Sequence, residues 1–310
     1  MSNLERQTAV ERTGDGTYRS DIVEDWKMWV PIGGYLTSIA LRAAQAHAPS
    51  TMARPVSVSC HYLNEAKVGP ADLEVTTLRS TDRAGSYLVR MNQDGQDILA
   101  ALVSAAPTGE LSPTLNWQEP PAADRPDELE TTILDDDVLA LMGDEPFWKM
   151  LEFRMVKGLM GSHNYPGVEE LTPEEMKFTP RRDAHIRGWQ RMPCGEGHKD
   201  PWVDACRSVI ITAAMQFATV ADPFTPPLQF IAPTMNLTVD FHTFHPEEQW
   251  LLADAVGSYA GDGLLGAETR LWTQSGDFVA TANSKMTYHD FSDPRTMERL
   301  GKSWFQLTEN

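Results

Sequence analysis

The sequence predicts an α+β protein built from two similar halves, each with one helix laid across a meander of antiparallel strands. Apolar residues recur at helical spacing from Gly33 to His47 and again from Ala205 to Val220. An alternating strand pattern follows each helical stretch, first at 56–64 and later at 234–243. Because the same order runs twice in one chain, we expect two half-domains that bury a shared face.

In the first half, residues 17–30 are expected to be extended. Gly33 and Gly34 then open the helix, where the unpaired N–H groups of the first turn can be approached closely. Pro49 closes this helical segment. Strands are expected after it, with a glycine turn before the last one, at 56–64, 71–80, 85–93 and 96–105.

The two halves are joined by a proline-punctuated stretch that turns acidic from Asp124 to Asp137. This composition predicts an inter-domain connection with a short helix at 136–142. We therefore divide the chain into an N-terminal half at 1–118, a linker at 119–145, a C-terminal half at 146–295 and a tail at 296–310.

The second half begins with strands expected at 149–156 and 184–192. The long polar loop between them, at 158–180, predicts either a lid over a site or a plain surface insertion. After the helix at 205–220, strands are expected at 234–243, 249–258, 264–274 and 277–288. In the first of these, Leu237 and its alternate neighbours should face the core, and the polar residues from Asn236 to His242 the other side.

Composition limits the classes of partner. The 310 residues are 41% hydrophobic and carry a net charge of −18, so we expect neither a nucleic-acid partner nor an anionic membrane partner. No apolar run approaches the roughly 20 residues of a membrane span. A local basic group is either a solvated face or a place for a phosphate-bearing small ligand: Arg181, Arg182, Arg187, Arg191 and Lys199.

The cysteines predict no disulfide framework and no zinc site, because three are too few and too scattered. Cys60 and Cys206 lie among apolar residues and are expected to be small core residues, while Cys194 does not. No apolar signal segment follows the charged N-terminal residues. We expect a cytoplasmic protein that uses no metal and no cofactor.

A long helix wrapped by a curved antiparallel sheet, present twice, resembles the double hotdog fold. The motifs are similar to those of the acyl-CoA thioesterase II-type family of the thioesterase-like superfamily. In the first half they are Pro31-x-Gly33-Gly34-Tyr35-Leu36, His61-Tyr62-Leu63 and Gln93-Asp94-Gly95. In the second half they are Asn236 to His242, Trp250-Leu251-Leu252, Ser258 to Gly263, Arg270-Leu271-Trp272 and Gly276 to Ala280. The resemblance spans roughly residues 15–290 and implies two antiparallel sheets, each wrapped around a central helix.

The resemblance also implies hydrolysis of an acyl-CoA thioester by activated water, without a covalent intermediate. Family members typically use an Asp, a Ser or Thr, and a Gln for this, and the corresponding positions here are Asn236, Ser258 and Ser284. An Asn can position water or donate a hydrogen bond, but it cannot accept a proton as a carboxylate does. Either another carboxylate serves, or the protein does something else with an acyl ligand.

Further candidates lie nearby in the sequence. Asp240 and His242 share the expected strand face of Asn236, about 6–7 Å apart, and form either an acid–base pair or part of a solvent-exposed polar face. Gly33 and Gly34 either supply N–H groups to a thioester oxygen or allow tight packing. Tyr35 and Asp262 are further candidates for substrate binding. Asp262 lies in a glycine-rich bend, where the alternative is that it only stabilises a turn.

Three functions follow. The first is a thioesterase acting on an acyl-CoA or acyl-carrier thioester in lipid metabolism, its acyl chain lying between the two helices. The second is a dehydratase, isomerase or cyclase acting on an acyl or polyketide intermediate through Asp240 and His242. The third is an acyl-binding protein that has lost the chemistry. Pairing into a homo-oligomer is an expectation of the resemblance.

Overall fold

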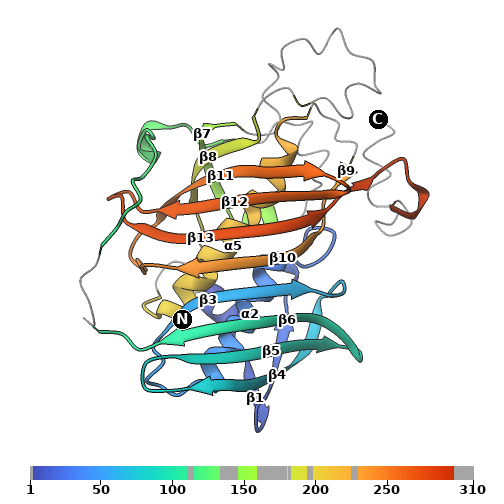
Figure 1. Ribbon diagram of the computed structural model, residues 1–310, viewed down its shortest axis with the longest axis vertical. Helices are drawn as coiled ribbons and strands as arrows, with labels where there is room; N and C mark the ends of the chain where they lie inside the picture. The colour runs from blue at the N-terminus through green and yellow to red at the C-terminus, as the bar shows by residue number, and fades with distance from the viewer. Residues whose placement is uncertain are drawn as a thin grey trace.

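A computed structural model describes residues 3–109, 115–132, 146–158, 180, 183–193, 198–224 and 230–296. Twelve of the described strands form one antiparallel sheet, in the order β1-β2-β4-β5-β6-β3-β10-β13-β12-β11-β8-β7 (Figure 1). The strand order shows the same pattern from either edge of the sheet. The two strands that precede the long helix of each half lie at the edge, the three strands of the meander come next, and the strand that directly follows the helix lies at the centre. The chain is thus an α+β double hotdog whose two sheets are joined edge to edge.

The N-terminal half holds one long helix, α2 (Gly33–His47), behind six strands. Its sheet consists of β1 (Glu11–Gly14), β2 (Thr17–Ile22), β3 (Arg54–Tyr62), β4 (Gly69–Ser80), β5 (Gly85–Gln93) and β6 (Gln96–Ala106). Two short helices precede α2, namely α1 (Asn3–Gln7) and η1 (Glu24–Trp26). The side of the sheet that faces α2 carries the apolar set of each strand, as the burial pattern of β2 and β4 shows.

The C-terminal half repeats this plan around a longer helix, α5 (Pro201–Ala221). Its strands in the sheet are β7 (Glu152–Lys157), β8 (His185–Arg191), β10 (Thr234–Phe241), β11 (Trp250–Gly261), β12 (Leu264–Trp272) and β13 (Phe278–Thr287). The short strands β9 (Phe230–Ile231) and β14 (His289–Asp290) pair separately. Two 3-10 helices, η2 (Pro126–Glu128) and η3 (Pro146–Lys149), lie between the halves along the chain.

The halves meet where β3 pairs with β10 and where α2 packs against α5. Across the strands, Ser59 and Thr238 are opposite each other and their hydroxyls are 3.0 Å apart. The helices run antiparallel, since Ser38 donates to the carbonyl of Cys206 while Arg42, later in α2, pairs with Asp200 just before α5 begins. One apolar core therefore runs through both halves.

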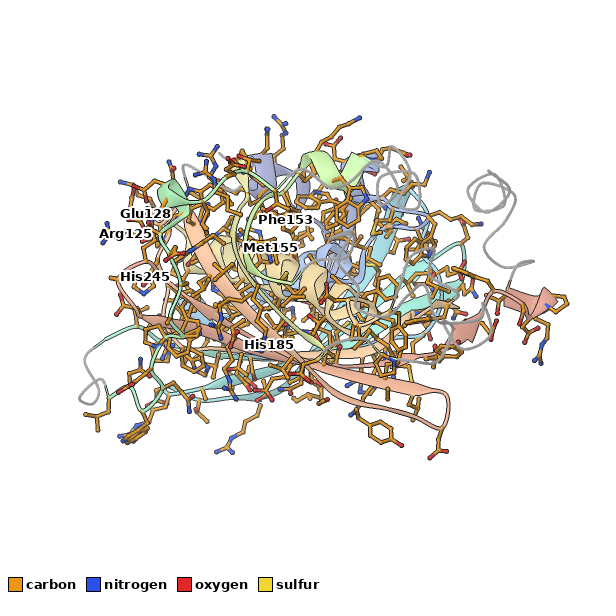
Figure 2. All side chains as sticks on the ribbon, turned by 90° about the horizontal axis from the view of Figure 1, so that it is seen from above. Arg125, Glu128, Phe153, Met155, His185 and His245 are labelled. Carbon is orange, nitrogen blue, oxygen red and sulfur yellow. The ribbon has the colours of Figure 1, made fainter. Side chains whose placement is uncertain are left out.

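Seen from above, both long helices lie on one side of the curved sheet (Figure 2). Phe153 and Met155, on the edge strand β7, pack against this core from the flank. Helix α5 is long and apolar enough to match a membrane span, but 78% of its most apolar 18-residue window is buried. That burial is what a core helix of a two-layer domain requires, so the match is weak support for a membrane segment.

Most of the expected elements are present within a few residues of their predicted ends. Strand β10 alternates as predicted from Leu237 to Phe241, with Leu237, Val239 and Phe241 buried. Met235, expected on the same face, is instead 45% exposed, because the pairing with β13 shifts register between Thr234 and Asn236. Helix α5 begins four residues before the predicted start, because Asp200 caps it and Pro201 occupies its first turn. The extended prediction for 17–30 fails after β2, where η1 forms. The predicted helix at 136–142, most of the 158–180 loop and Cys194 lie outside the described residues.

Candidate functional site

A cavity of about 360 Å³ opens where the two halves meet. Its walls come from the start of α2, the end of β3, helix η3, the C-terminal half of α5, and the segment that leads into β10. Most of the lining side chains are apolar, including Leu36, Phe147, Trp148, Phe217 and Phe230. Such a wall favours a hydrocarbon or aromatic group over a charged one.

The N-terminus of α2 borders this cavity through Ile32, Gly33 and Gly34. Ile32 is the N-cap residue and its apolar side chain makes no capping hydrogen bond. The N–H groups of Ile32 and Tyr35 donate to the carbonyls of Trp26 and Ile32, so among the described contacts those of Gly33 and Gly34 remain for a ligand, at the end of the helix where its dipole places partial positive charge. This end of α2 can therefore donate to an oxygen of a bound ligand.

Two glycines allow close contacts at this end of α2. A Cβ atom on Gly33 would lie 2.7 Å from Cζ of Tyr62, so the phenol ring of Tyr62 packs directly on the Gly33 backbone. A Cβ atom on Gly34 would lie 2.8 Å from that of Ala213, so the second glycine lets α2 and α5 cross closely. The two readings of these glycines are thus compatible: Gly34 serves packing, and both line the cavity.

A buried polar network lies on the α5 side of the cavity. The Ser284 hydroxyl on β13 donates to Oε1 of Gln216 on α5 at 2.8 Å, and Nε2 of Gln216 donates to the Thr269 hydroxyl on β12 at 2.7 Å. All three side chains are at most 4% exposed, and Gln216 lines the cavity. Its amide is held at both ends, which leaves one N–H of Nε2 beyond the two bonds described.

The other residues of the predicted catalytic set are placed differently. Asn236 lies on β10 opposite His61 of β3 and Lys285 of β13, on the face directed away from the helices, and is not a lining residue. Ser258 is exposed in β11, beside a register shift in the pairing with β12. Its hydroxyl lies over Gly266. None of the three is itself a lining residue, but Ser284 is hydrogen-bonded to Gln216, which does line the cavity.

Asp240 and His242 also lie on the outward side of the sheet, and both are exposed. The His242 ring stacks on Phe278 and its Nε2 is 3.1 Å from the Thr281 hydroxyl. Partial burial lowers the pKa of His242, and the Asp240 carboxylate opposes this only in part. The two side chains share one face of the strand, as the alternation predicted, but the cavity lies on the other side of the sheet.

Tyr35 and Asp262, the remaining predicted substrate-binding residues, also lie outside the cavity lining. Tyr35 is buried against Trp26, and its hydroxyl donates to the carbonyl of Gln7 at 2.7 Å. Asp262 occupies the hairpin turn between β11 and β12 with φ at 52°, followed by Gly263 at 73°. The turn needs left-handed backbone at both positions, which explains the Asp–Gly pair.

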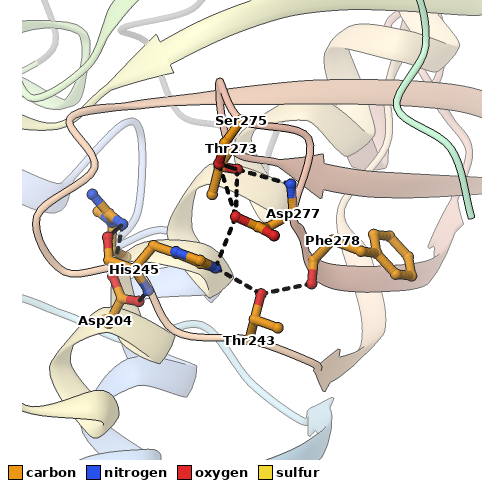
Figure 3. Close-up of polar contacts among 8 residues, drawn as sticks. Asp204, Thr243, His245, Thr273, Ser275, Asp277 and Phe278 are labelled. Atoms are coloured by element: carbon orange, nitrogen blue, oxygen red, sulfur yellow. Dashed lines mark hydrogen bonds and ion pairs between the residues drawn. The ribbon is translucent and has the colours of Figure 1, made fainter. Parts of the chain in front are cut away.

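The second long helix starts in a different environment. Asp200 caps α5 by accepting from the Trp202 N–H at 2.9 Å, and Asp204 pairs with Arg207 at 2.7 Å while both are at most 3% exposed. Asp204 also accepts from the His245 N–H (Figure 3). Burial alone would raise the pKa of Asp204, but Arg207 and the hydrogen bonds to His198 and His245 outweigh it and lower the pKa.

Most of the clustered basic residues noted in the sequence form ion pairs with carboxylates, as far as the structure describes them. Arg187 pairs with Asp254 at 2.7 Å and Arg191 with Glu152 at 2.9 Å. His185, labelled in Figure 2, is 2.8 Å from Asp254 as well. Burial would raise the pKa of Asp254, yet Arg187 and His185 outweigh it and lower the pKa. On this side of the described sheet, these basic side chains are therefore paired with acidic ones. Arg181 and Arg182 lie outside the described residues.

Cys60 and Cys206 are buried and unpaired by disulfides, as expected for core residues. Burial raises the pKa of each thiol to about 12, so both stay protonated. Among the residues that the structure describes, no group of three or more His, Cys, Asp or Glu side chains is arranged to hold a metal ion.

Sequence reasoning missed Gln216 and Thr269. A signal for Gln216 was present, because it stands seven residues after Val209 and three after Ala213, on the apolar stripe of α5. A polar residue at a core position of a helix needs a buried partner. Thr269 gave no such signal, since an inward-facing threonine is ordinary in a strand.

The fold is that of a double hotdog protein with a mostly apolar cavity between its halves. The chain belongs to the acyl-CoA thioesterase family: the model of that family's N-terminal domain matches residues 22–106, and the model of its C-terminal domain matches residues 130–286. A comparison of the sequence with curated proteins found no match.

Solved structures show the same fold at low sequence identity. A conserved protein of unknown function with a hot dog fold from Alicyclobacillus acidocaldarius has a TM-score of 0.72 and 18% identity, covering 93% of this chain and 98% of that one. An acyl-CoA thioesterase II from Mycobacterium marinum has a TM-score of 0.69 and 17% identity, covering 93% and 98%.

A more distant structure shares the architecture. The dehydratase domain of PpsC from Mycobacterium tuberculosis, in complex with C12:1-CoA, has a TM-score of 0.54 and 12% identity, covering 92% of this chain and 99% of that one. At such identity the likeness concerns the fold alone.

Proposed function

We propose that this protein binds an acyl thioester, carried by coenzyme A or a carrier protein, in the cavity and hydrolyses it. The observation that carries the proposal is that one apolar cavity is bordered by the uncapped N-terminus of α2 and by Gln216 of the buried network. The apolar wall takes the acyl chain. The two polar borders take the thioester carbonyl and the water that attacks it.

The start of α2 is suited to the carbonyl oxygen. As water adds to the carbonyl carbon, negative charge develops on that oxygen, and donors already in place stabilise it. The N–H groups of Gly33 and Gly34 border the cavity and lie at the positive end of the helix dipole. A thiolate is a better leaving group than an amine and can depart without being protonated. Stabilising the oxyanion is therefore the larger part of the catalytic task.

Gln216 is suited to hold the attacking water. Because Ser284 and Thr269 fix both ends of its amide, the amide is oriented before a ligand arrives. Proton acceptance falls to His289, an imidazole that lines the same cavity and lies 2.9 Å from the Thr287 hydroxyl. General-base help of this kind contributes roughly 10²–10⁴-fold to a rate.

Binding without turnover is the second candidate function. One observation favours it: Asn236 and Ser284 correspond by resemblance to the family's Asp and Gln, and the network that holds Gln216 at the cavity consists of an amide and two hydroxyls. An amide cannot take up a proton. In that case the protein would hold an acyl thioester rather than cleave it.

Thiol release from acyl-CoAs of increasing chain length, measured with titration of binding to the same compounds, separates the two functions. We expect saturable thiol release for at least one chain length. Binding without thiol release would favour the second candidate, and the absence of both from folded protein would contradict the proposal.

A matched pair of variants locates the site. Gln216→Leu should lower kcat by roughly 100-fold, since it removes the group that orients water. Gln190→Leu is the control, because Gln190 is equally buried, on β8, and its side-chain amide has no hydrogen-bond partner among the described residues. It should leave kcat within about twofold and the protein as stable or more so. Equal effects of the two variants would remove Gln216 from the site.

A further inference from the structure

Tyr62 places a phenol hydroxyl at the open end of α2. It is the last residue of β3, it lines the cavity, and its ring packs on the backbone of Gly33, where an added Cβ would lie 2.8 Å from the phenol oxygen. The hydroxyl therefore lies beside the first turn of α2, next to the N–H groups that face the ligand. This residue was not among those predicted from the sequence to act on a substrate.

The Tyr62 hydroxyl lies 2.8 Å from the hydroxyl of Thr37 and also has a hydrogen-bonding contact with the Cys60 thiol. Thr37 lies one turn further along α2 and is fully buried. Either hydroxyl can be the donor in this pair. When Thr37 donates, the proton of Tyr62 can turn from the weakly accepting Cys60 sulfur to the oxygen of a ligand, and the bond from Thr37 makes the phenol a better donor.

The phenol stays protonated under working conditions. Burial raises the pKa of Tyr62 well above its usual value, and the neighbouring Cys60 thiol adds to the rise. Cys60 is itself held as a neutral thiol. A neutral O–H in an apolar wall is a donor without the desolvation cost of a charged one.

The geometry points to Tyr62 as a hydrogen-bond donor to the carbonyl oxygen of the bound thioester, positioned by Thr37 and acting together with the N-terminus of α2. This inference rests on the proposed function and adds a residue to it. In the step concerned, water adds to the carbonyl carbon and gives up one proton to His289, while the C=O π electrons move to oxygen. Tyr62 and the N–H groups donate to that oxygen without giving up a proton, and collapse of the adduct expels the thiolate.

Tyr62→Phe removes the hydroxyl and keeps the ring on Gly33. We expect kcat to fall by roughly 10- to 100-fold with KM within about twofold, because the lost bond strengthens as charge develops. Tyr18→Phe is the matched control: the Tyr18 hydroxyl contacts the His47 ring at the opposite end of α2, and this change should leave kcat unaltered.

Thr37→Val tests the positioning role. It should lower kcat less than Tyr62→Phe does, and the double variant should be no slower than Tyr62→Phe alone, because both changes act on one hydrogen bond. A purely structural Tyr62 would instead give thermal destabilisation with unchanged kcat, or additive effects in the double variant. Either result would overturn the inference.

A readout without turnover keeps this inference separate from the proposed function. In octanoyl-CoA labelled with ¹³C at the thioester carbonyl, a hydrogen bond from Tyr62 lowers the carbonyl stretching frequency in the bound complex. Tyr62→Phe should raise that frequency, and Tyr18→Phe should not. No shift with Tyr62→Phe, although octanoyl-CoA binds, overturns the role of Tyr62 alone. A wild-type protein that neither binds nor cleaves octanoyl-CoA or its longer homologues overturns the proposed function, and this inference with it.

Discussion

The two long helices start in opposite ways, although they occupy matching places in the two halves. Helix α5 begins with the capping carboxylate of Asp200, and its first turn also holds Asp204 paired with Arg207. Helix α2 begins with Ile32, which caps nothing, and its first turn contains no acidic residue. The positive end of α5 is thus neutralised by its own side chains, whereas that of α2 borders the cavity.

The difference indicates how a duplicated fold can keep one site. Two identical halves would offer two helix starts to a ligand. Here Arg42 and Gln45 of α2 reach the Asp200 carboxylate, at 3.2 and 2.6 Å, so the N-terminal half itself helps to close the start of α5. The start that lacks a built-in anion is the one that lines the cavity. Capping thus distinguishes the two helix starts, and under the proposed function the uncapped one receives the ligand.

The largest effect is expected from Asp204→Asn, which tests the capped start of α5. The variant leaves the buried Arg207 guanidinium without its carboxylate, and breaking a buried pair in this way costs about 3–5 kcal/mol. We expect a correspondingly large fall in the free energy of unfolding, measured by urea denaturation. If stability changes by less than about 1 kcal/mol, the Asp204–Arg207 pair is not what holds this end together.

The same residue predicts a pH dependence. The pKa of Asp204 is lower in the folded protein than the usual value of about 3.9. Its ionised form therefore contributes stability that is complete above that value and is lost as the pH falls through the lower, folded pKa. Urea denaturation from pH 6 down to pH 3 should show wild type losing stability more steeply at the acid end than Asp204→Asn does.

The uncapped start of α2 is tested by giving it an acidic cap like that of α5. In Ile32→Asp, the new carboxylate would accept from the N–H groups of the first turn and repel a developing oxyanion. We expect kcat for the best acyl-CoA to fall by roughly 100-fold, equivalent to about 2.7 kcal/mol. Ile32→Leu keeps the apolar side chain and should retain activity. An Ile32→Asp protein with wild-type kcat would show that the start of α2 takes no part in the reaction.

A smaller effect is expected from uncapping the closed end. Asp200→Ala removes the acceptor of the Trp202 N–H and the partner of Arg42, which should cost about 1–2 kcal/mol. The start of α5 does not line the cavity, so turnover should stay within about twofold of wild type. Thermal unfolding and thiol release on one preparation measure both. A selective loss of turnover would mean that the two helix starts are coupled.

The sequence was sufficient for the fold because the same periodic signals occur twice. The apolar stripes of α2 and α5 and the alternation in β10 arise from the repeat of helix and strand geometry, which local sequence reports directly. The predicted start of α5 lies four residues too late, because the apolar periodicity does not register the cap and first turn formed by Asp200 and Pro201. Local spacing says little about the N-terminal segments α1 and β1, whose places depend on contacts with the rest of the half.

The candidate site was harder to predict, for a physical reason. Alternation shows that Asn236, Asp240 and His242 share one face of β10, but it does not show which face the ligand meets. In a sheet wrapped around helices, the polar face is directed outward and the cavity lies on the apolar side. The site groups there, Gln216 and Tyr62, are single polar residues in apolar surroundings, which a pattern of polar residues does not reveal.

The smallest expected effect comes from that outward face. Asp240→Asn and His242→Gln remove the acid–base pair that a dehydratase or isomerase would need, and both side chains are exposed outside the cavity lining. Each should change thiol release by less than about twofold and stability by less than about 0.5 kcal/mol, as is usual for surface substitutions. Product analysis by mass spectrometry with a 3-hydroxyacyl-CoA provides the counter-test. Dehydrated product from wild type that disappears in His242→Gln would move the chemistry to the outer face, and the contrast between the two helix starts would then concern packing rather than catalysis.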